Sequence, residues 1–193
     1  MIVYSQVMFK YLLEQSLKIS PKAFYFFGHR KMLISSNIWF YIIILQIGDK
    51  VPQFSLLDQN GTQRTNNGLK TPLVLFFYPK DDTPGCTIEV CGFRDKYDLF
   101  KVLGAQVWGV SNGSSTSHLA FANKNKLQYP LLCDINDSLR KTFKVPKVLG
   151  FMDGRVTYVI DRNGFIKHIF RDLLNGPEHI KEAIRVLKEI QNQ

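Results

Sequence analysis

A continuous apolar run, PLVLFFY, extends from Pro72 to Tyr78 and constrains the fold more than any other stretch of the chain. It has the length of a β-strand, and its lack of alternation indicates a strand that is buried on both faces. A second such run, AQVWGVS, covers residues 105–111, and a helical stretch ending near Leu103 lies between the two. Two buried strands separated by a helix predict parallel neighbours at the centre of an α/β sheet.

The segments after residue 111 continue this alternation. SSTSHLAFANKNK predicts a helix with Ser114 or Ser115 as its N-cap, YPLLCD a short buried strand, and DSLRKTF a short helix. RVTYVID and FIKHIF follow, and the DRNG turn between them predicts a β-hairpin. The closing PEHIKEAIRVLKEI predicts a helix with one apolar face. The residues of this face are Ile180, Ala183, Ile184 and Leu187.

These elements predict an α/β domain with a mixed central sheet flanked by helices, parallel at the centre and antiparallel at one edge. This is the element order of the thioredoxin-like fold. The domain covers residues 47–193, which begin with a short strand in PQFSLLD and a tight turn at Asn60–Gly61. Because 45% of the chain's 193 residues are hydrophobic, it can bury the core of one such domain.

Residues 1–46 differ from the rest, with five basic residues against one acidic residue and a final apolar run, NIWFYIIILQI. The run is about half of the ~20 residues that a membrane-spanning helix needs, so we expect no stable membrane insertion. Three interpretations are open: a targeting segment, a membrane-surface anchor, or an upstream translation that the working protein lacks. We favour the last, because the regular pattern begins abruptly at Ile47.

The stretch TPGCTIEVC, downstream of the first buried strand, contains two of the chain's three cysteines, Cys86 and Cys91. Thr83 is a good N-cap residue and Pro84 is favoured at the first helical position, so we expect a helix to begin here. Cys86 then lies in the first turn, where unpaired N–H groups and the helix dipole stabilise a thiolate over a thiol. Because the thiolate is the nucleophile, Cys86 is the better candidate for reaction.

Cys91 lies five residues further along the predicted helix. This spacing corresponds to about 140° around the helix and to Cα atoms about 8–9 Å apart. A disulfide needs Cα atoms within about 7 Å, so the two cysteines can bond only if the helix unwinds. Cys86 shares an inward stripe with Val90 and Phe93, whereas Cys91 faces away. From the residues alone, two small buried side chains stay the alternative to a reactive pair.

Pro79, Thr83 and Cys86 form a P-x-x-x-T-x-x-C frame at the carboxyl end of the strand, where sites form in open α/β sheets. The segment PKDDTPGCTIEVCGFRD resembles the active-site signature of the peroxiredoxins. A cysteine five residues after the first is typical of their Q type, the bacterioferritin comigratory proteins. The similarity extends over residues 47–193, including SHLAFANKNKL and GRVTYVID, and looks closest to cyanobacterial and plastid members.

The resemblance implies a role for each matching residue. Cys86 would be the peroxidatic cysteine, which becomes a sulfenic acid, and Cys91 the resolving cysteine, which condenses with it into an intramolecular disulfide. Thr83 would hydrogen-bond the peroxide, and Pro79 would shield the sulfenate from a second oxidation. Arg155, in GRVTYVID, would hold Cys86 as thiolate and stabilise the departing oxygen. The role of Arg155 depends on the resemblance alone.

The resemblance implies a thiol-dependent peroxidase that reduces hydrogen peroxide and alkyl hydroperoxides in antioxidant defence and cell redox homeostasis, without a bound cofactor. Thioredoxin or a similar dithiol protein would recycle it, and the protein would be a monomer. The odd cysteine count favours a reducing, bacterial cytoplasm, with the plastid stroma as the alternative. Two other interpretations are a thioredoxin-like disulfide reductase, against which the four-residue gap argues, and a redox sensor or holdase that responds to helix unwinding.

Other functional classes have no support in the sequence. It contains neither GxGxxG nor GxxxxGK[ST], and its net charge of +9 includes no basic run interleaved with aromatics, so no nucleic-acid partner is predicted. The four histidines form no cluster with cysteine or acidic residues, so no metal site is predicted. We interpret Cys133 as a core residue. Arg94 lies about 12 Å along the helix from Cys86 and is interpreted as a structural residue. Glu89 is interpreted as a local hydrogen-bonding or solvated residue.

Overall fold

The structure is a computed structural model that describes residues 45–148 and 152–192, together with the backbone of four short strands between residues 26 and 40. The chain divides into two units, Met1–Ile44 and Leu45–Gln193. In the first unit, two antiparallel pairs are described: β1 (Phe26–Phe27) with β2 (Arg30–Lys31), and β3 (Leu33–Ser35) with β4 (Ile38–Phe40). Residues 1–46, interpreted above as a targeting segment, a membrane-surface anchor or an upstream translation that the working protein lacks, lie mostly outside the described residues.

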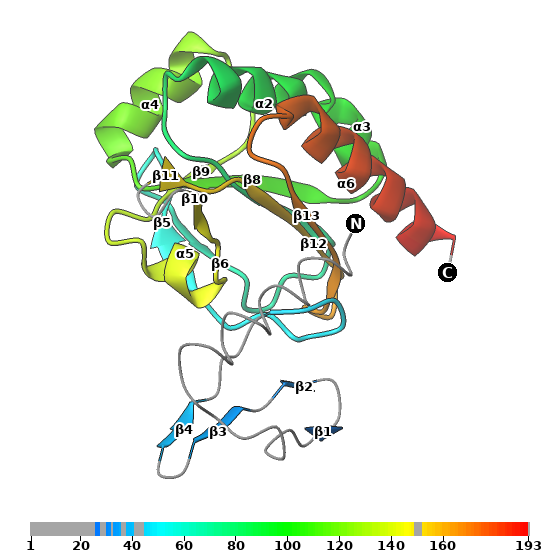
Figure 1. Ribbon diagram of the computed structural model, residues 1–193. Helices are drawn as coiled ribbons and strands as arrows, with labels where there is room; N and C mark the ends of the chain where they lie inside the picture. Colours follow the sequence, from blue (N-terminus) through cyan, green and yellow to red (C-terminus); the bar gives the residue numbers. More distant parts are fainter. Residues whose placement is uncertain are drawn as a thin grey trace. The chain divides into compact units, whose positions relative to one another are not determined.

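The second unit is built on a five-stranded sheet with the order β13-β12-β7-β8-β9 (Figure 1). Strands β7, β8 and β9 are parallel, while β12 is antiparallel to β7 and β13 is antiparallel to β12. The mixed sheet with a parallel centre and an antiparallel edge is therefore confirmed. The strands are β7 (Leu73–Phe77), β8 (Gln106–Ser111), β9 (Leu131–Cys133), β12 (Val156–Ile160) and β13 (Ile166–Arg171).

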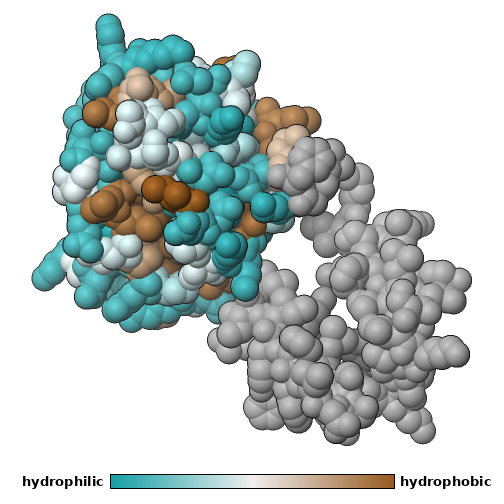
Figure 2. Space-filling view, turned by 90° about the vertical axis from the view of Figure 1, so that its left-hand side faces the viewer, coloured by the Kyte–Doolittle hydropathy of each residue, from teal (hydrophilic) through white to brown (hydrophobic). Residues whose placement is uncertain are grey.

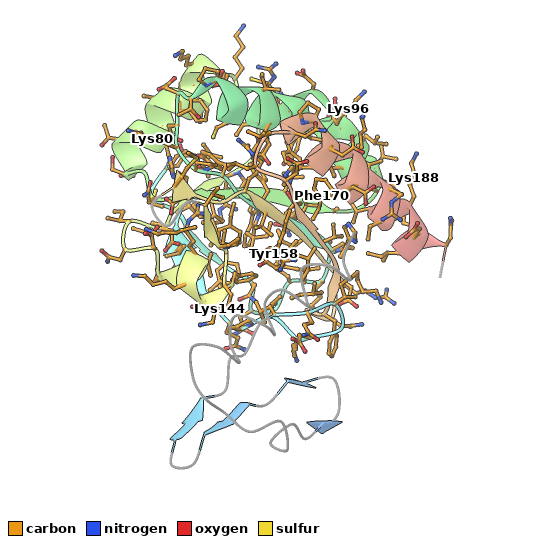
Figure 3. The ribbon with its side chains drawn as sticks, viewed as in Figure 1. Lys80, Lys96, Lys144, Tyr158, Phe170 and Lys188 are labelled. Atoms are coloured by element: carbon orange, nitrogen blue, oxygen red, sulfur yellow. The ribbon has the colours of Figure 1, made fainter. Side chains whose placement is uncertain are left out.

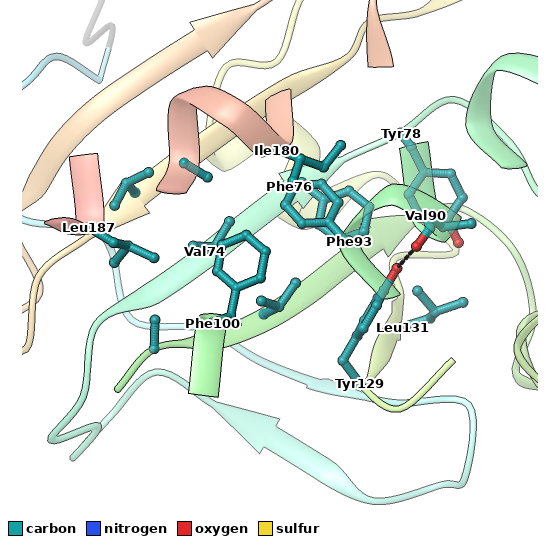
Figure 4. Close-up of a cluster of buried hydrophobic side chains, with 14 of the residues drawn as sticks. Val74, Phe76, Tyr78, Val90, Phe93, Phe100, Tyr129, Leu131, Ile180 and Leu187 are labelled. Atoms are coloured by element: carbon teal, nitrogen blue, oxygen red, sulfur yellow. Dashed lines mark hydrogen bonds between the residues drawn. The ribbon is translucent and has the colours of Figure 1, made fainter. Parts of the chain in front are cut away.

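Helices pack on one face of this sheet, above it in Figure 1. Val74, Phe76 and Tyr78 point to this face, since side chains alternate along a strand. They meet a stack of aromatic rings in which Phe76 and Phe93 lie 4.3 Å apart, centroid to centroid (Figure 4). The helices are α2 (Pro84–Asp95), α3 (Tyr97–Val102), α4 (Ser115–Lys124) and α6 (Gly176–Gln191).

The opposite face of the sheet has its own apolar cluster, which includes Leu73, Leu75 and Phe77 of β7. It is covered by α5 (Ser138–Thr142) and by the hairpin of β5 (Ser55–Leu57) and β6 (Gln63–Thr65). Burial of β7 on both faces explains why its sequence is apolar at every position.

The surface follows the expected division of polar and apolar side chains. Tyr158 lies inside the second unit, whereas Lys80, Lys96 and Lys188 extend into solvent (Figure 3). The side of the molecule that carries β5 and α5 also shows apolar side chains at its surface (Figure 2). Leu57 and Ile135 line a surface pocket of about 340 Å³ there. Among the residues that the structure describes, no helix is both long and apolar enough to cross a bilayer.

Two details differ from the sequence-based expectations. The helical stretch expected to run to Leu103 is divided into α2 and α3, because Lys96 adopts φ −106° and ψ 7°, outside the helical region. A short antiparallel pair, β10 (Lys147–Val148) with β11 (Met152–Asp153), was not expected, since two-residue strands leave no periodic pattern. Helix α4 begins as expected, with the Ser114 hydroxyl accepting a hydrogen bond from Ser117 N.

Candidate active site

The predicted start of the reactive helix is confirmed. Thr83 takes the N-cap position in an extended conformation, Pro84 follows inside the helix, and Thr87 N donates the first helical hydrogen bond to Thr83 O. Cys86 therefore lies in the first turn of α2, just beyond the carboxyl end of β7, and is only 2% exposed. At this position the free N–H groups and the dipole of α2 favour negative charge on the sulfur.

Arg155 lies beside Cys86 although 69 residues separate them in the chain, with its Nη2 atom 3.5 Å from Cys86 Sγ. The sheet explains this proximity. Val156 of β12 pairs with Phe77 of β7, so the residue before Val156 reaches the end of β7 where α2 begins. The Arg155 Nε atom donates to Leu173 O at 3.1 Å, which fixes the plane of the guanidinium group. Arg155 is 5% exposed, so its charge acts on the sulfur with little screening by water.

Glu89 and His179 complete this buried group, and the sequence did not identify either as part of a site. Glu89 lies one turn after Cys86, is fully buried, and accepts a hydrogen bond from Arg155 Nη1. Its other oxygen, Oε1, is 3.7 Å from His179 Nδ1 and has no hydrogen-bond partner among the described residues. Arg155 therefore contacts two acidic groups, the Cys86 thiol and the Glu89 carboxyl, and His179 lies next to Glu89.

The Glu89 carboxyl and the Cys86 sulfur both contact the guanidinium group of Arg155. Burial raises the pKa of Glu89 to about 8, although the Arg155 guanidinium acts in the opposite direction. This shift favours the neutral form of the Glu89 carboxyl. The positive charge of Arg155 is then free to be balanced by negative charge on Cys86 rather than by Glu89.

His179 is neutral in this arrangement. Its Nε2 atom is 2.8 Å from Asp172 O, which can only accept a hydrogen bond, so Nε2 carries the hydrogen. Its Nδ1 atom then accepts from the Thr157 hydroxyl at 2.7 Å. Burial lowers the pKa of His179 from 6.5 to about 4.

We expect His179 to make the folded protein sensitive to acid. Because its pKa is lower in the folded state than in the unfolded chain, unfolding takes up a proton between pH 6.5 and about 4. The stability that the neutral His179 contributes is fully present above pH 6.5 and is lost as the pH falls through this window. At pH 4.5 the free energy of unfolding is lower by about 2–3 kcal/mol for this reason. Urea unfolding of wild type and His179→Gln across this range measures it. If acid lowers the free energy of unfolding equally in both proteins, His179 is not the group responsible.

Pro79 and Thr83 lie in the loop between β7 and α2, close in sequence to Cys86. The Thr83 hydroxyl donates to Lys80 O at 3.2 Å instead of capping α2. Pro79 is half-buried, and its carbonyl oxygen accepts from the Ser111 hydroxyl at 3.4 Å. The structure thus places both residues in the segment that precedes the thiol, and their roles toward peroxide stay predictions.

A buried carboxylate, Asp81, holds this loop in place. It accepts hydrogen bonds from the Tyr78 and Ser117 hydroxyls, each at 2.7 Å, and its Oδ2 atom lies 2.7 Å from His118 Nδ1. Burial alone would raise its pKa, but the hydrogen bonds from His118, Ser117 and Tyr78 outweigh burial and lower it. The loop before Cys86 is therefore attached to the first turn of α4.

The other two cysteines are separate from this group. Cys91 is half-buried on another face of α2, where its sulfur lies 3.6 Å from Asn125 Oδ1. All three cysteines are free thiols. Burial raises the pKa of Cys133, at the end of β9, to about 11, which suits an inert core thiol. Within the described part of the chain no group of three or more potential ligands could hold a metal ion.

Comparison with known proteins identifies the family. The profile of the AhpC/TSA family matches residues 47–169. Among curated proteins, the chloroplastic peroxiredoxin Q of Sedum lineare is 42% identical over 146 residues, which are 75% of this chain and 78% of that protein. The chloroplastic peroxiredoxin Q of Arabidopsis thaliana is 46% identical over 143 residues, 73% of this chain and 66% of that protein.

Solved structures agree with the sequence relatives. Peroxidoxin BcpB from Mycobacterium tuberculosis superposes with a TM-score of 0.70 at 34% identity, covering 76% of this chain and 98% of that one. A mutant of PrxQ from Xylella fastidiosa superposes with a TM-score of 0.71 at 30% identity, with the same coverage of both chains. The expected thioredoxin-like α/β fold is thereby confirmed. By profile, by curated relatives and by solved fold, the chain belongs to the AhpC/TSA family and, within it, to the peroxiredoxin Q group.

Proposed function

We propose that this chain reduces peroxides through Cys86 and closes its catalytic cycle through Cys91. As a member of the peroxiredoxin Q group it is a thiol-dependent peroxidase, an oxidoreductase of antioxidant function. The observation that carries the assignment of Cys86 is its place in the first turn of α2, with Arg155 Nη2 at 3.5 Å from its sulfur. Among the three cysteines, Cys86 alone combines a helix N-terminus with a neighbouring guanidinium group among the described contacts.

The first chemical step is attack of the Cys86 thiolate on one oxygen of the peroxide O–O bond. The new S–O bond gives a sulfenic acid, and the second oxygen leaves with the bond's electron pair and takes up a proton as water or alcohol. Arg155 can stabilise negative charge on both the attacking sulfur and the leaving oxygen. Thr83 would orient the peroxide, and Pro79 would limit access of a second peroxide.

The second step is condensation of the sulfenic acid with the Cys91 thiol, which forms a disulfide and releases water. The two cysteines face different sides of α2, so this step requires local unwinding of the helix. A dithiol protein such as thioredoxin then reduces the disulfide by exchange. This need for unwinding also argues against a disulfide reductase, whose two thiols form their bond without leaving the helix.

Membership of the family bears on the substrates, the reductant and the cellular location of this chain. Peroxiredoxins act on peroxides and are recycled by thioredoxin-like reductants, and we propose hydrogen peroxide and alkyl hydroperoxides as the substrates of this chain. The chloroplastic relatives support the plastid stroma as its location. A bacterial cytoplasm and a monomeric state stay predictions from the sequence.

One stoichiometric oxidation tests the role of Cys91. With one equivalent of hydrogen peroxide, the wild type should lose the mass of two hydrogen atoms and part of its far-UV helical signal. Cys91→Ser should instead gain the mass of one oxygen atom and keep its helical signal, because its sulfenic acid has no resolving partner. A wild type that keeps its mass and its helix under these conditions would rule out the internal disulfide.

A further inference from the structure

Asn125, at the C-terminal end of α4, contacts the helix that carries both cysteines. It follows the last residue of α4, is 9% exposed, and its Oδ1 atom lies 3.6 Å from Cys91 Sγ, within the range of a hydrogen bond donated by a thiol. None of the roles assigned so far to residues of this site involves Asn125. Among the described residues, Asn125 Oδ1 is the one polar atom that the Cys91 sulfur contacts.

The orientation of the Asn125 amide is fixed by its own helix. Its Nδ2 atom donates to Phe121 O at 2.8 Å, a carbonyl group of α4 that also accepts from Asn125 N at 3.1 Å. A carbonyl group can only accept, so the nitrogen must face Phe121 and the oxygen must face Cys91. The end of α4 therefore presents an acceptor to the Cys91 thiol without any rearrangement.

Two further contacts hold the same part of α2. Arg94, three residues after Cys91, donates from Nη1 to Asn125 O at 2.7 Å. The Tyr129 hydroxyl, which is fully buried, donates to Val90 O at 2.7 Å (Figure 4). Asn125 thus takes part in two of three contacts that keep the turn around Cys91 helical, and its side chain is the one that touches the sulfur itself.

We propose that Asn125 is a positioning residue that holds Cys91 away from Cys86, and so limits the rate at which the disulfide closes once Cys86 has been oxidised. The proposal rests on the resolving role of Cys91 given above. The step that it controls converts the Cys86 sulfenic acid and the Cys91 thiol into a disulfide and water. The Cys91 sulfur must leave the Asn125 amide before its electron pair can attack the sulfenic sulfur.

Asn125→Ala should accelerate this step without changing the reaction with peroxide. The loss of one weak hydrogen bond predicts disulfide closure about three- to tenfold faster. The protein is mixed with one equivalent of hydrogen peroxide, quenched at intervals with acid, alkylated, and analysed by intact mass for the fraction that has closed. With excess peroxide, the variant should also accumulate less Cys86 sulfinic acid, because faster closure leaves less time for a second oxidation.

Two control variants separate a specific contact from a general loosening of α4. Asn123→Ala removes the same side chain two residues earlier, where it is exposed, and should close at the wild-type rate. Ser114→Ala removes the N-cap bond at the other end of α4 and weakens the helix without touching Cys91. Closure in Ser114→Ala that is as fast as in Asn125→Ala would overturn the proposal.

The remaining outcomes are also decisive. If the wild type forms the internal disulfide and Asn125→Ala forms it at the same rate, the positioning role is overturned and the resolving role of Cys91 stays intact. A wild type that forms no internal disulfide would overturn the resolving role, and the positioning role with it.

Discussion

Replacement of Cys86 by serine is expected to abolish peroxide reduction. Serine keeps the size and the helix position of Cys86, but its hydroxyl is far less acidic than a thiol and cannot form a sulfenic acid. Removal of a catalytic nucleophile costs at least about 10³-fold in rate. Consumption of hydrogen peroxide, coupled to NADPH oxidation through thioredoxin and its reductase, should therefore fall to the background of the assay.

Cys133→Ser is the matched control for this experiment. Burial raises the pKa of Cys133 to about 11, and strand β8 separates its strand, β9, from β7 in the sheet. Its replacement should leave the rate of peroxide consumption unchanged. Full turnover by Cys86→Ser, or a loss of activity in Cys133→Ser comparable to that in Cys86→Ser, would refute the assignment of Cys86 as the nucleophile.

The position of Cys86 could be predicted because its determinants are local. Thr83 and Pro84 mark the helix start within three residues of the cysteine, and the apolar run before them fixes a buried strand. The helical wheel also predicted correctly that Cys91 lies on another face. It could not predict that Cys91 packs against Asn125, because that contact joins residues 34 positions apart.

The electrostatic part of the site could not be predicted from spacing. Arg155 reaches Cys86 only because β12 pairs with β7 in one particular register. Glu89 looked like a solvated or locally hydrogen-bonded helix residue, and only the docking of α6 shows that it is buried. Gly176, the first residue of α6, lies so close that an added Cβ would be 3.0 Å from Glu89 Cβ. Such contacts depend on tertiary packing, which leaves no periodic trace in the sequence.

Replacement of Arg155 by methionine is expected to lower the rate of peroxide consumption by about 10²–10³-fold. The side chain keeps its approximate length, but the positive charge next to the Cys86 sulfur is lost. Arg155→Met should also lower the free energy of unfolding by about 1–3 kcal/mol, because the buried Glu89 carboxyl loses its hydrogen-bond donor. Initial rates and urea unfolding of the variant measure the two effects.

A double variant separates the catalytic role of Arg155 from its structural role. Replacement of both buried partners by apolar side chains of similar shape is nearly neutral for stability, so Arg155→Met with Glu89→Met should regain most of the lost stability. Its activity should nevertheless stay as low as that of Arg155→Met, because no cation faces Cys86. If activity returns together with stability, Arg155 acts only by holding the fold. If stability returns alone, the charge itself acts on the sulfur and the leaving oxygen, as the 3.5 Å contact between Arg155 and Cys86 indicates.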